Sequence, residues 1–209
     1  MPARPVKIGA AAVAAVVALG VAVELGRRSA GSPPARVAAD RPAATTSPVP
    51  STAPAGFVEF RDDKAGWAMS YPKAWNVLSP KSADVVLVVS EKPPQADAGG
   101  SVLVHDLAFP TAVTDANLAA AKAVTDKIVQ EGGGAALTQP QVVHQGGLPG
   151  YVYFYSFKDP ATGQEGVHSH YFLFKGSTLI SVVFQALPAD TFRALAPTFD
   201  QIIGSFRVV

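Results

Sequence analysis

The sequence predicts an α+β fold, an antiparallel sheet flanked by helices, preceded by an apolar amino-terminal segment and a proline-rich linker. Composition changes abruptly at Phe57, and every Trp, Tyr and Phe of the 209-residue chain lies at or after this position. Downstream, short apolar runs bounded by turn residues alternate with two segments of helical periodicity. The resulting order of strands, helix, strands, helix is typical of helices packed on an antiparallel sheet. We expect three parts: residues 1–28, 29–56 and 57–209.

The first part carries an uncharged apolar run that begins at Ile8 and ends at Val23. At about 1.5 Å per helical residue, this run is slightly shorter than a hydrocarbon core of roughly 30 Å. It is therefore interpreted as a signal peptide or as a short membrane anchor. Arginines that follow the run favour a cytosolic domain by the positive-inside rule. The linker that comes next favours export instead.

Residues 29–56 form the expected linker, which consists mainly of Pro, Ala, Ser and Thr. Such a segment buries too little apolar surface to fold, and its prolines keep it extended as a spacer. A spacer behind an export segment separates a domain from a membrane. We expect a single-pass protein of the cell membrane with its domain on the extracytoplasmic side, or a product secreted after signal cleavage.

Charge and cysteine content exclude several classes of function. Residues 1–56 hold six basic and two acidic side chains, a net charge of +4, whereas the remainder holds 11 basic and 14 acidic side chains, a net charge of −3. The domain therefore gives no reason to expect nucleic-acid binding. The chain has no cysteine, which excludes disulfides, thiolate zinc sites, thiol catalysis and lipid attachment through cysteine.

The first half of the domain contains three expected strands and one helix. Residues 66–71 (GWAMSY) are a strand that ends at Pro72, because proline blocks ladder pairing. Residues 84–90 and 101–109 are apolar strands separated by a loop rich in proline and glycine. The helix over 117–131 has an apolar stripe and ends at three consecutive glycines.

The second half returns to strands before a final helix. The strands are expected over 141–145, 150–158, 167–175 and 177–186. Turn signals at 159–163 and at Gly176 join the last three strands into an antiparallel meander. The final helix runs over 190–203, where Pro197 either kinks it or opens its second half.

Two histidines share one face of an expected strand. His168 and His170 alternate along it, and that spacing suits two metal ligands, with His105, His144 or Asp106 completing a set. The alternative is a partly buried, hydrogen-bonded end of the sheet surface, which Phe172 continues. We favour the alternative and expect no metal and no cofactor, while keeping the two histidines as candidate residues for ligand or partner binding.

Aromatic residues alternate in the same way along residues 150–158. Tyr151, Tyr153 and Tyr155 share one side with Phe157, and stacked rings with polar tips suit an apolar or sugar-like ligand. The alternative is that one face of this strand is core beneath a helix. The three tyrosines complete the candidate ligand-binding or partner-binding set.

No catalytic arrangement emerges from the sequence. The G-x-S-x-G pattern and the phosphate-binding glycine pattern are absent, and the glycines at 132–134 follow a helix instead of opening one. The sequence therefore predicts a protein that is not an enzyme.

The domain resembles the PsbP-like family, and in particular the LpqN-type envelope lipoproteins of actinobacteria. The resemblance rests on the opening strand with Pro72 and Trp75, the helix over 117–131, the late meander, and a closing helix that ends in IIGSF at 202–206. It implies an antiparallel sheet flanked by helices and a non-enzymatic binding or accessory module outside the membrane. Related lipoproteins are associated with envelope lipid transport and bind amphipathic ligands or protein partners. This chain lacks the cysteine that a lipoprotein carries after its signal.

Three functions follow from the sequence and the resemblance together. The first is an exported accessory protein that binds an envelope membrane protein or a lipid-like amphipathic ligand, with a possible link to lipid transport. The second is an assembly factor that docks on a membrane complex without any ligand. The third is a hydrolase, which no catalytic motif in the sequence supports.

Overall fold

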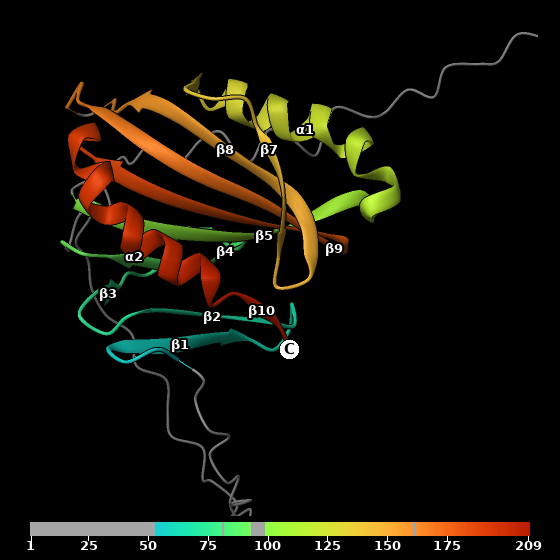
Figure 1. Ribbon diagram of the computed structural model, residues 1–209, viewed down its shortest axis with the longest axis horizontal. Coiled ribbons are helices and arrows are strands. Elements are labelled where there is room, and N and C mark those ends of the chain that lie inside the picture. The colour runs from blue at the N-terminus through green and yellow to red at the C-terminus, as the bar shows by residue number, and fades with distance from the viewer. Residues whose placement is uncertain (1–52, 81, 93–98, 161) are drawn as a thin grey trace, which may run out of the picture.

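The computed structural model describes residues 53–80, 82–92, 99–160 and 162–209 (Figure 1). The apolar segment of residues 8–23 and nearly all of the linker lie outside these residues. The elements follow in chain order: β1 (Phe57–Asp62), β2 (Trp67–Pro72), β3 (Asn76–Val77), β4 (Val85–Ser90), β5 (Gly99–Val113), α1 (Leu118–Glu131), β6 (Ala135–Ala136), β7 (Gln141–Gln145), β8 (Leu148–Lys158), β9 (Glu165–Leu187), α2 (Phe192–Gly204) and β10 (Arg207–Val208). Neither of the described helices is long and apolar enough to cross a membrane.

The strands form two antiparallel sheets, which confirms the predicted α+β class and divides its sheet in two. The larger has seven strands in the order β3-β4-β5-β9-β8-β6, and β7 also pairs with β8. The smaller has three strands in the order β1-β2-β10. It therefore joins the first described strands to the last one, through pairs such as Trp67 with Val208.

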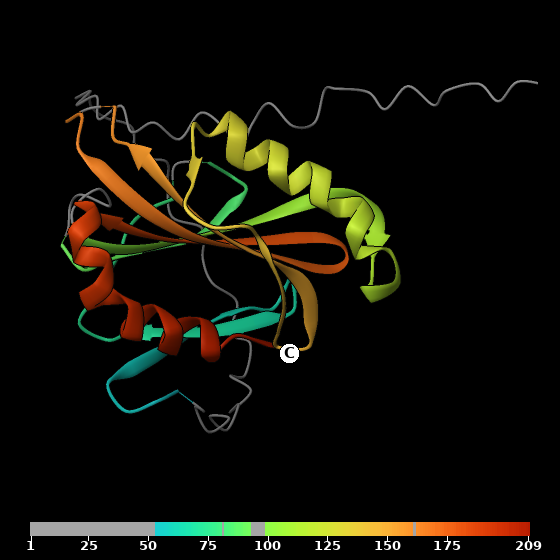
Figure 2. The same cartoon turned by 45° about the horizontal axis from the view of Figure 1, so that its top comes forward.

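The two helices lie on opposite faces of the seven-stranded sheet (Figure 2). On one face α2 and the small sheet enclose the main core, which includes Trp67, Phe184 and Ile202, all with an exposed fraction of 0%. On the other face α1 covers a second cluster around Phe172 and Phe174. The large sheet is thus buried from both sides over its middle strands, and the filling of these two layers decides where a site can form.

The long strand β9 forms where the sequence predicts two strands and a turn. Its first half pairs with β8 and its second half pairs with β5. Gly176, at the junction, has a φ of 59°, which glycine adopts without the steric cost of a side chain. The chain doubles back there (Figure 2), so the predicted meander is confirmed although the strand is continuous.

The helices begin close to their predicted positions. A 3₁₀ turn at Asp115–Asn117 precedes α1, and Asn117 Oδ1 accepts a hydrogen bond from the Thr114 amide at 2.7 Å. Gly132 to Gly134 then ends the helix as expected. In α2, Pro197 lies within a continuous helix, and the helix begins at Phe192 after a second 3₁₀ turn.

Candidate functional site

The five residues predicted to bind a ligand or partner lie together on the α1 face of the large sheet. Tyr153 pairs with His170 and Tyr155 pairs with His168 across β8 and β9, so the predicted alternation is confirmed. Tyr151, Tyr153, Tyr155 and His170 are buried, and His168 is partly buried. In this state α1 covers the tyrosines, and their role in binding stays a prediction.

The tyrosine hydroxyls hold α1 against the sheet. Tyr153 Oη lies 2.7 Å from Thr125 Oγ1 and donates to Asp126 Oδ1 at 2.8 Å. Tyr151 Oη donates to the Leu118 carbonyl at 3.2 Å. Because buried hydroxyls are stable only when hydrogen-bonded, these contacts fix both the rings and the helix.

Replacing Tyr153 with Phe is expected to destabilise the fold by about 1–2 kcal/mol, because it leaves the buried Thr125 and the partly buried Asp126 without their shared partner. Tyr151→Phe is the matched control, and it should cost less because it breaks one longer bond to a backbone carbonyl. Urea unfolding followed by tryptophan fluorescence measures both. Equal losses for the two variants would show that the Tyr153 hydroxyl has no special part in holding α1.

His170 sits in a fully buried polar chain. Its Nε2 lies 2.6 Å from Ser181 Oγ and its Nδ1 lies 3.0 Å from Tyr155 Oη. A serine bonded to a histidine resembles part of a nucleophilic site. Ser181, however, has an exposed fraction of 1%, and neither of the described cavities is lined by it. The pair is therefore buried between the sheet's own side chains in the described chain.

His168 is held in one tautomer. Its Nε2 lies 2.9 Å from Gln185 Oε1, so Nε2 carries the proton and donates. Its Nδ1 is buried and has no hydrogen-bond partner within the described chain. Phe157 stacks on the ring with centroids 4.1 Å apart. This packing supports only the neutral imidazole.

Burial lowers the pKa of both histidines. The pKa of His168 falls to about 4 because desolvation outweighs the bond to Gln185. The pKa of His170 falls well below 6.5, first through desolvation and then through repulsion from the neighbouring His168 and His105. Both rings are neutral in the folded protein near neutral pH.

The other histidines considered as metal ligands are each paired with a carboxylate. His105 Nδ1 lies 3.0 Å from Asp84 Oδ2, and His144 Nε2 lies 2.6 Å from Asp115 Oδ1 near the start of α1. Among the residues that the structure describes, no three His, Cys, Asp or Glu side chains are grouped to hold a metal ion.

Asp106 lies on the opposite face of the sheet, where it links the two sheets. It accepts a hydrogen bond from Trp67 Nε1 at 3.2 Å. Burial, together with the neighbouring carboxyl of Asp62, raises the pKa of Asp106 to about 6. Beside it, Lys175 Nζ donates to the Gly66 carbonyl at 2.9 Å. This cluster ties the β1–β2 turn to β5 and β9.

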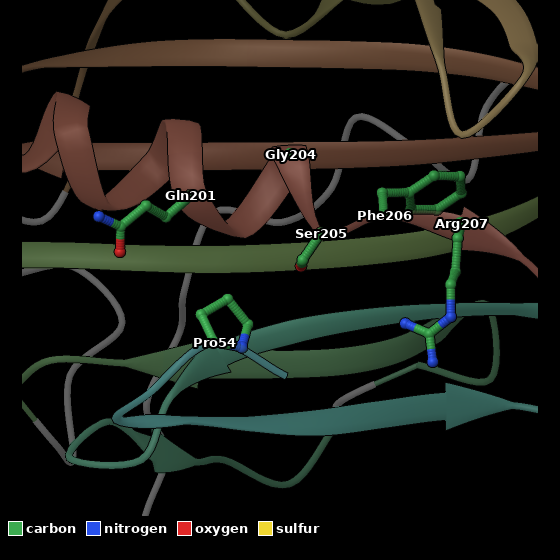
Figure 3. Close-up of a pocket in the computed structure, with 6 residues that line it drawn as sticks. All are labelled: Pro54, Gln201, Gly204, Ser205, Phe206 and Arg207. Carbon is green, nitrogen blue, oxygen red and sulfur yellow. The ribbon is translucent and has the colours of Figure 1, made fainter. Parts of the chain in front are cut away.

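Two surface cavities occur in the described part of the chain. One, of about 480 Å³, lies at the end of α2 above the small sheet (Figure 3), lined by Pro54, Gln201, Gly204, Ser205, Phe206 and Arg207. At its rim, the guanidinium of Arg207 is already paired with Glu59. The other, of about 330 Å³, lies beside Phe157 at the β6 edge. Both are open toward solvent, and polar groups form part of the lining of each.

The outer edge of the large sheet exposes two large apolar side chains. It consists of the segment from β6 to β7, next to β8 (Figure 1). Leu137 and Val142 on this segment have exposed fractions of 55% and 59%. Sequence reasoning missed this edge, although a signal existed: residues 132–157 contain no Asp, Glu, Lys or Arg. Natural edge strands are usually protected by charges.

Comparison with known proteins gives the class to which the fold belongs. No family model matches the chain, and no curated protein matches it in sequence. Among solved structures, the cyanobacterial PsbP of Synechocystis is 16% identical with a TM-score of 0.54, covering 78% of this chain and 98% of its own. The fold is therefore PsbP-like, as the sequence resemblance predicts.

Two further structures are similar. A protein from Bacteroides thetaiotaomicron is 11% identical with a TM-score of 0.50, covering 72% of this chain, which spans 48% of that longer protein. LpqN, described as involved in cell envelope biogenesis of Mycobacterium tuberculosis, is 12% identical with a TM-score of 0.46, covering 68% of this chain and 83% of its own. At these identities the likeness concerns the fold.

Proposed function

We propose that this protein is a non-enzymatic accessory protein of the cell envelope that binds another protein. Of the two kinds of partner that the sequence allows, a protein and an amphipathic small ligand, the geometry favours the protein. The observation that supports this choice is the contrast between filled interior layers and an open, uncharged sheet edge.

The interior offers no described space for a lipid tail. The α2 layer is filled by the chain's own side chains, among them Phe184 and Phe199, whose ring centroids lie 5.1 Å apart. The α1 layer is filled by the tyrosine and histidine rings and by Phe172, whose ring stacks on His170 at 3.8 Å. The two cavities outside these layers are shallow and partly polar. A ligand would have to displace a helix to enter either layer.

Placement outside the membrane is part of the proposal. The apolar run of residues 8–23 is the expected export or anchoring segment, and the linker is long enough to hold the domain away from the bilayer. The PsbP-like fold is compatible with such a module. Docking on a membrane protein complex is the form of partner binding that this arrangement favours.

The proposal is tested by formaldehyde crosslinking of the full chain in intact cells, followed by identification and quantification of crosslinked proteins. We expect one or a few defined envelope proteins at yields well above those of an unrelated exported control protein. Native mass spectrometry of the full chain in detergent runs in parallel, and we expect no bound lipid near one molecule per chain.

The opposite pattern would overturn the proposal. A lipid retained at one copy per chain, together with no protein crosslinked above the control, would assign the amphipathic-ligand function instead. Turnover of an ester substrate that is lost in Ser181→Ala, with the fold intact, would likewise assign a hydrolase.

A further inference from the structure

The register of β7 on β8 fixes which backbone groups face outward. His144 lies opposite Pro149, and proline has no N–H, so this pair is not one that exchanges two backbone hydrogen bonds. Along an antiparallel ladder, pairs that exchange two backbone hydrogen bonds alternate with pairs that exchange none. Val142, opposite Tyr151, therefore also directs its N–H and C=O away from β8, whereas Val143 directs its own groups toward Gly150.

A backbone hydrogen bond further along the same edge agrees with this assignment. The Leu137 amide donates to the Phe154 carbonyl at 2.9 Å. Gly150, Val152 and Phe154 are alternate residues of β8. Backbone groups of alternate residues point to the same side of a strand, so all three residues direct theirs toward this edge. The outward groups of β7 are then the N–H and C=O of Val142 and His144, and within the described chain no strand pairs with them.

We propose that β7 is a docking strand that takes an extended, uncharged segment of the partner protein as an added strand of the sheet. This inference rests on the proposed function and names the surface and the chemistry of the partner. An added strand gains up to four backbone hydrogen bonds from Val142 and His144. Its alternate side chains pack beside Val142, whose exposed fraction is 59%.

The charge pattern indicates the kind of segment that fits. Residues 132–157 supply β6, β7, all of β8 except its last residue, Lys158, and their connections without a single charged side chain. The nearest carboxyl, that of Asp115, is already bonded to His144. A charged partner strand would find no opposite charge along β7, whereas β-branched and small polar residues suit a half-exposed pleated surface.

Two other occupants fit less well. A second copy would pair β7 with β7 over five residues, which falls short of the roughly 1,200 Å² buried in stable interfaces. The chain's own linker has prolines at 33, 34, 42, 48, 50 and 54, which remove donors that a ladder needs. A strand from another protein supplies the backbone donors that the linker lacks, and contacts of that protein outside β7 can add to the buried area.

The test uses the full chain in intact cells with a photo-crosslinking residue, p-benzoylphenylalanine, replacing Gln141 on β7. The matched control places it at Val77, an exposed residue on the opposite edge of the same sheet, whose exposed fraction of 59% equals that of Val142. We expect a crosslinked partner from position 141 and not from position 77. Mass spectrometry then identifies the crosslinked segment of the partner.

Two variants that also carry p-benzoylphenylalanine at position 141 separate backbone recognition from side-chain recognition. Val142→Pro removes one outward N–H while leaving the ladder to β8, and it should lower the crosslink yield at least about tenfold. Val142→Thr keeps that N–H and should stay within about twofold of the parent. A synthetic peptide of the identified segment should slow hydrogen exchange of the Val142 and His144 amides in the unmodified protein.

Several results would overturn the inference while leaving the proposed function intact. The first is that the partner found with formaldehyde is crosslinked from position 77 and not from position 141. The second is that Val142→Pro and Val142→Thr give equal crosslink yields. The third is that the peptide does not slow hydrogen exchange of the Val142 and His144 amides. A crosslink to a second copy of this chain would replace the partner strand with a dimer. Failure of the proposed function would instead appear as the absence of any formaldehyde partner.

Discussion

Lowering the pH from about 7.5 to about 5 is expected to destabilise the folded protein, because two histidines are held neutral beneath α1. The folded pKa of His168 is about 4, against about 6.5 in an unfolded chain. Between these values the unfolded state binds more protons, so stability falls as the pH falls. His168 alone should remove about 2 kcal/mol at pH 5, and His170 adds a loss of the same sign.

Asp106 contributes in the opposite direction, because its protonation stabilises the folded protein as the pH falls. Its folded pKa of about 6 lies above the ordinary value of 3.8. Between these values the folded state binds more protons, so Asp106 contributes stability as the pH falls, about 1 kcal/mol at pH 5. The lowered pKa values of Asp84 and Asp126 act in more acidic solution.

Two variants separate the opposing groups. Asp106→Asn should unmask a steeper loss of stability between pH 6.5 and 5, whereas His168→Gln should flatten it, because glutamine has no charge to acquire. The free energy of urea unfolding, measured by tryptophan fluorescence across this pH range, gives the slopes directly. A slope that is the same in the wild type and in His168→Gln would show that His168 titrates normally and is not held neutral.

Gly150→Ala is expected to cost about 3 kcal/mol or more, the largest effect of any glycine substitution in the sheet. A Cβ at this position would lie 2.1 Å from the Phe172 carbonyl oxygen and 3.1 Å from Leu173 Cδ2. Both are parts of the β8–β9 ladder, and a backbone oxygen in a ladder cannot turn aside as a flexible side chain can. The pairing of β8 and β9 would have to open.

The matched control for this substitution is Gly204→Ala at the end of α2. No atom lies within 4 Å of the Cβ that this change would add, and alanine favours a helix over glycine by up to about 1 kcal/mol. Urea unfolding should therefore show a large loss for Gly150→Ala and no loss for Gly204→Ala. Similar values for both would mean that β8 and β9 do not approach as closely as described.

Local patterns predicted most elements of this fold. β7 has the predicted bounds, and α1 begins one residue after its predicted start, since alternation, helical spacing and glycine stops are local signals. The small sheet could not be predicted in this way. β10 is a strand only because Arg207 and Val208 pair with Ala68 and Trp67, a contact between segments that lie far apart in the sequence.

The candidate site shows the same division. Alternation along β8 and β9 correctly predicted that the tyrosines and histidines share a face, because side chains alternate along any strand. Which helix covers that face depends on the path of the chain after β5, which no local pattern encodes. The open edge at β7 was missed because it is marked by an absence, the lack of charged residues, and not by a motif.

The pairing of the first described strands with the last one affects how the chain folds during synthesis. The ring of Phe206 stacks on the ring of Trp67 with centroids 5.7 Å apart. The Val209 amide donates a hydrogen bond to the Gly66 carbonyl. A chain emerging from the ribosome thus holds its first buried aromatic long before the residue that covers it exists. The small sheet can therefore close only after residues 206–209 have been synthesised, and Trp67 lacks its covering ring until then.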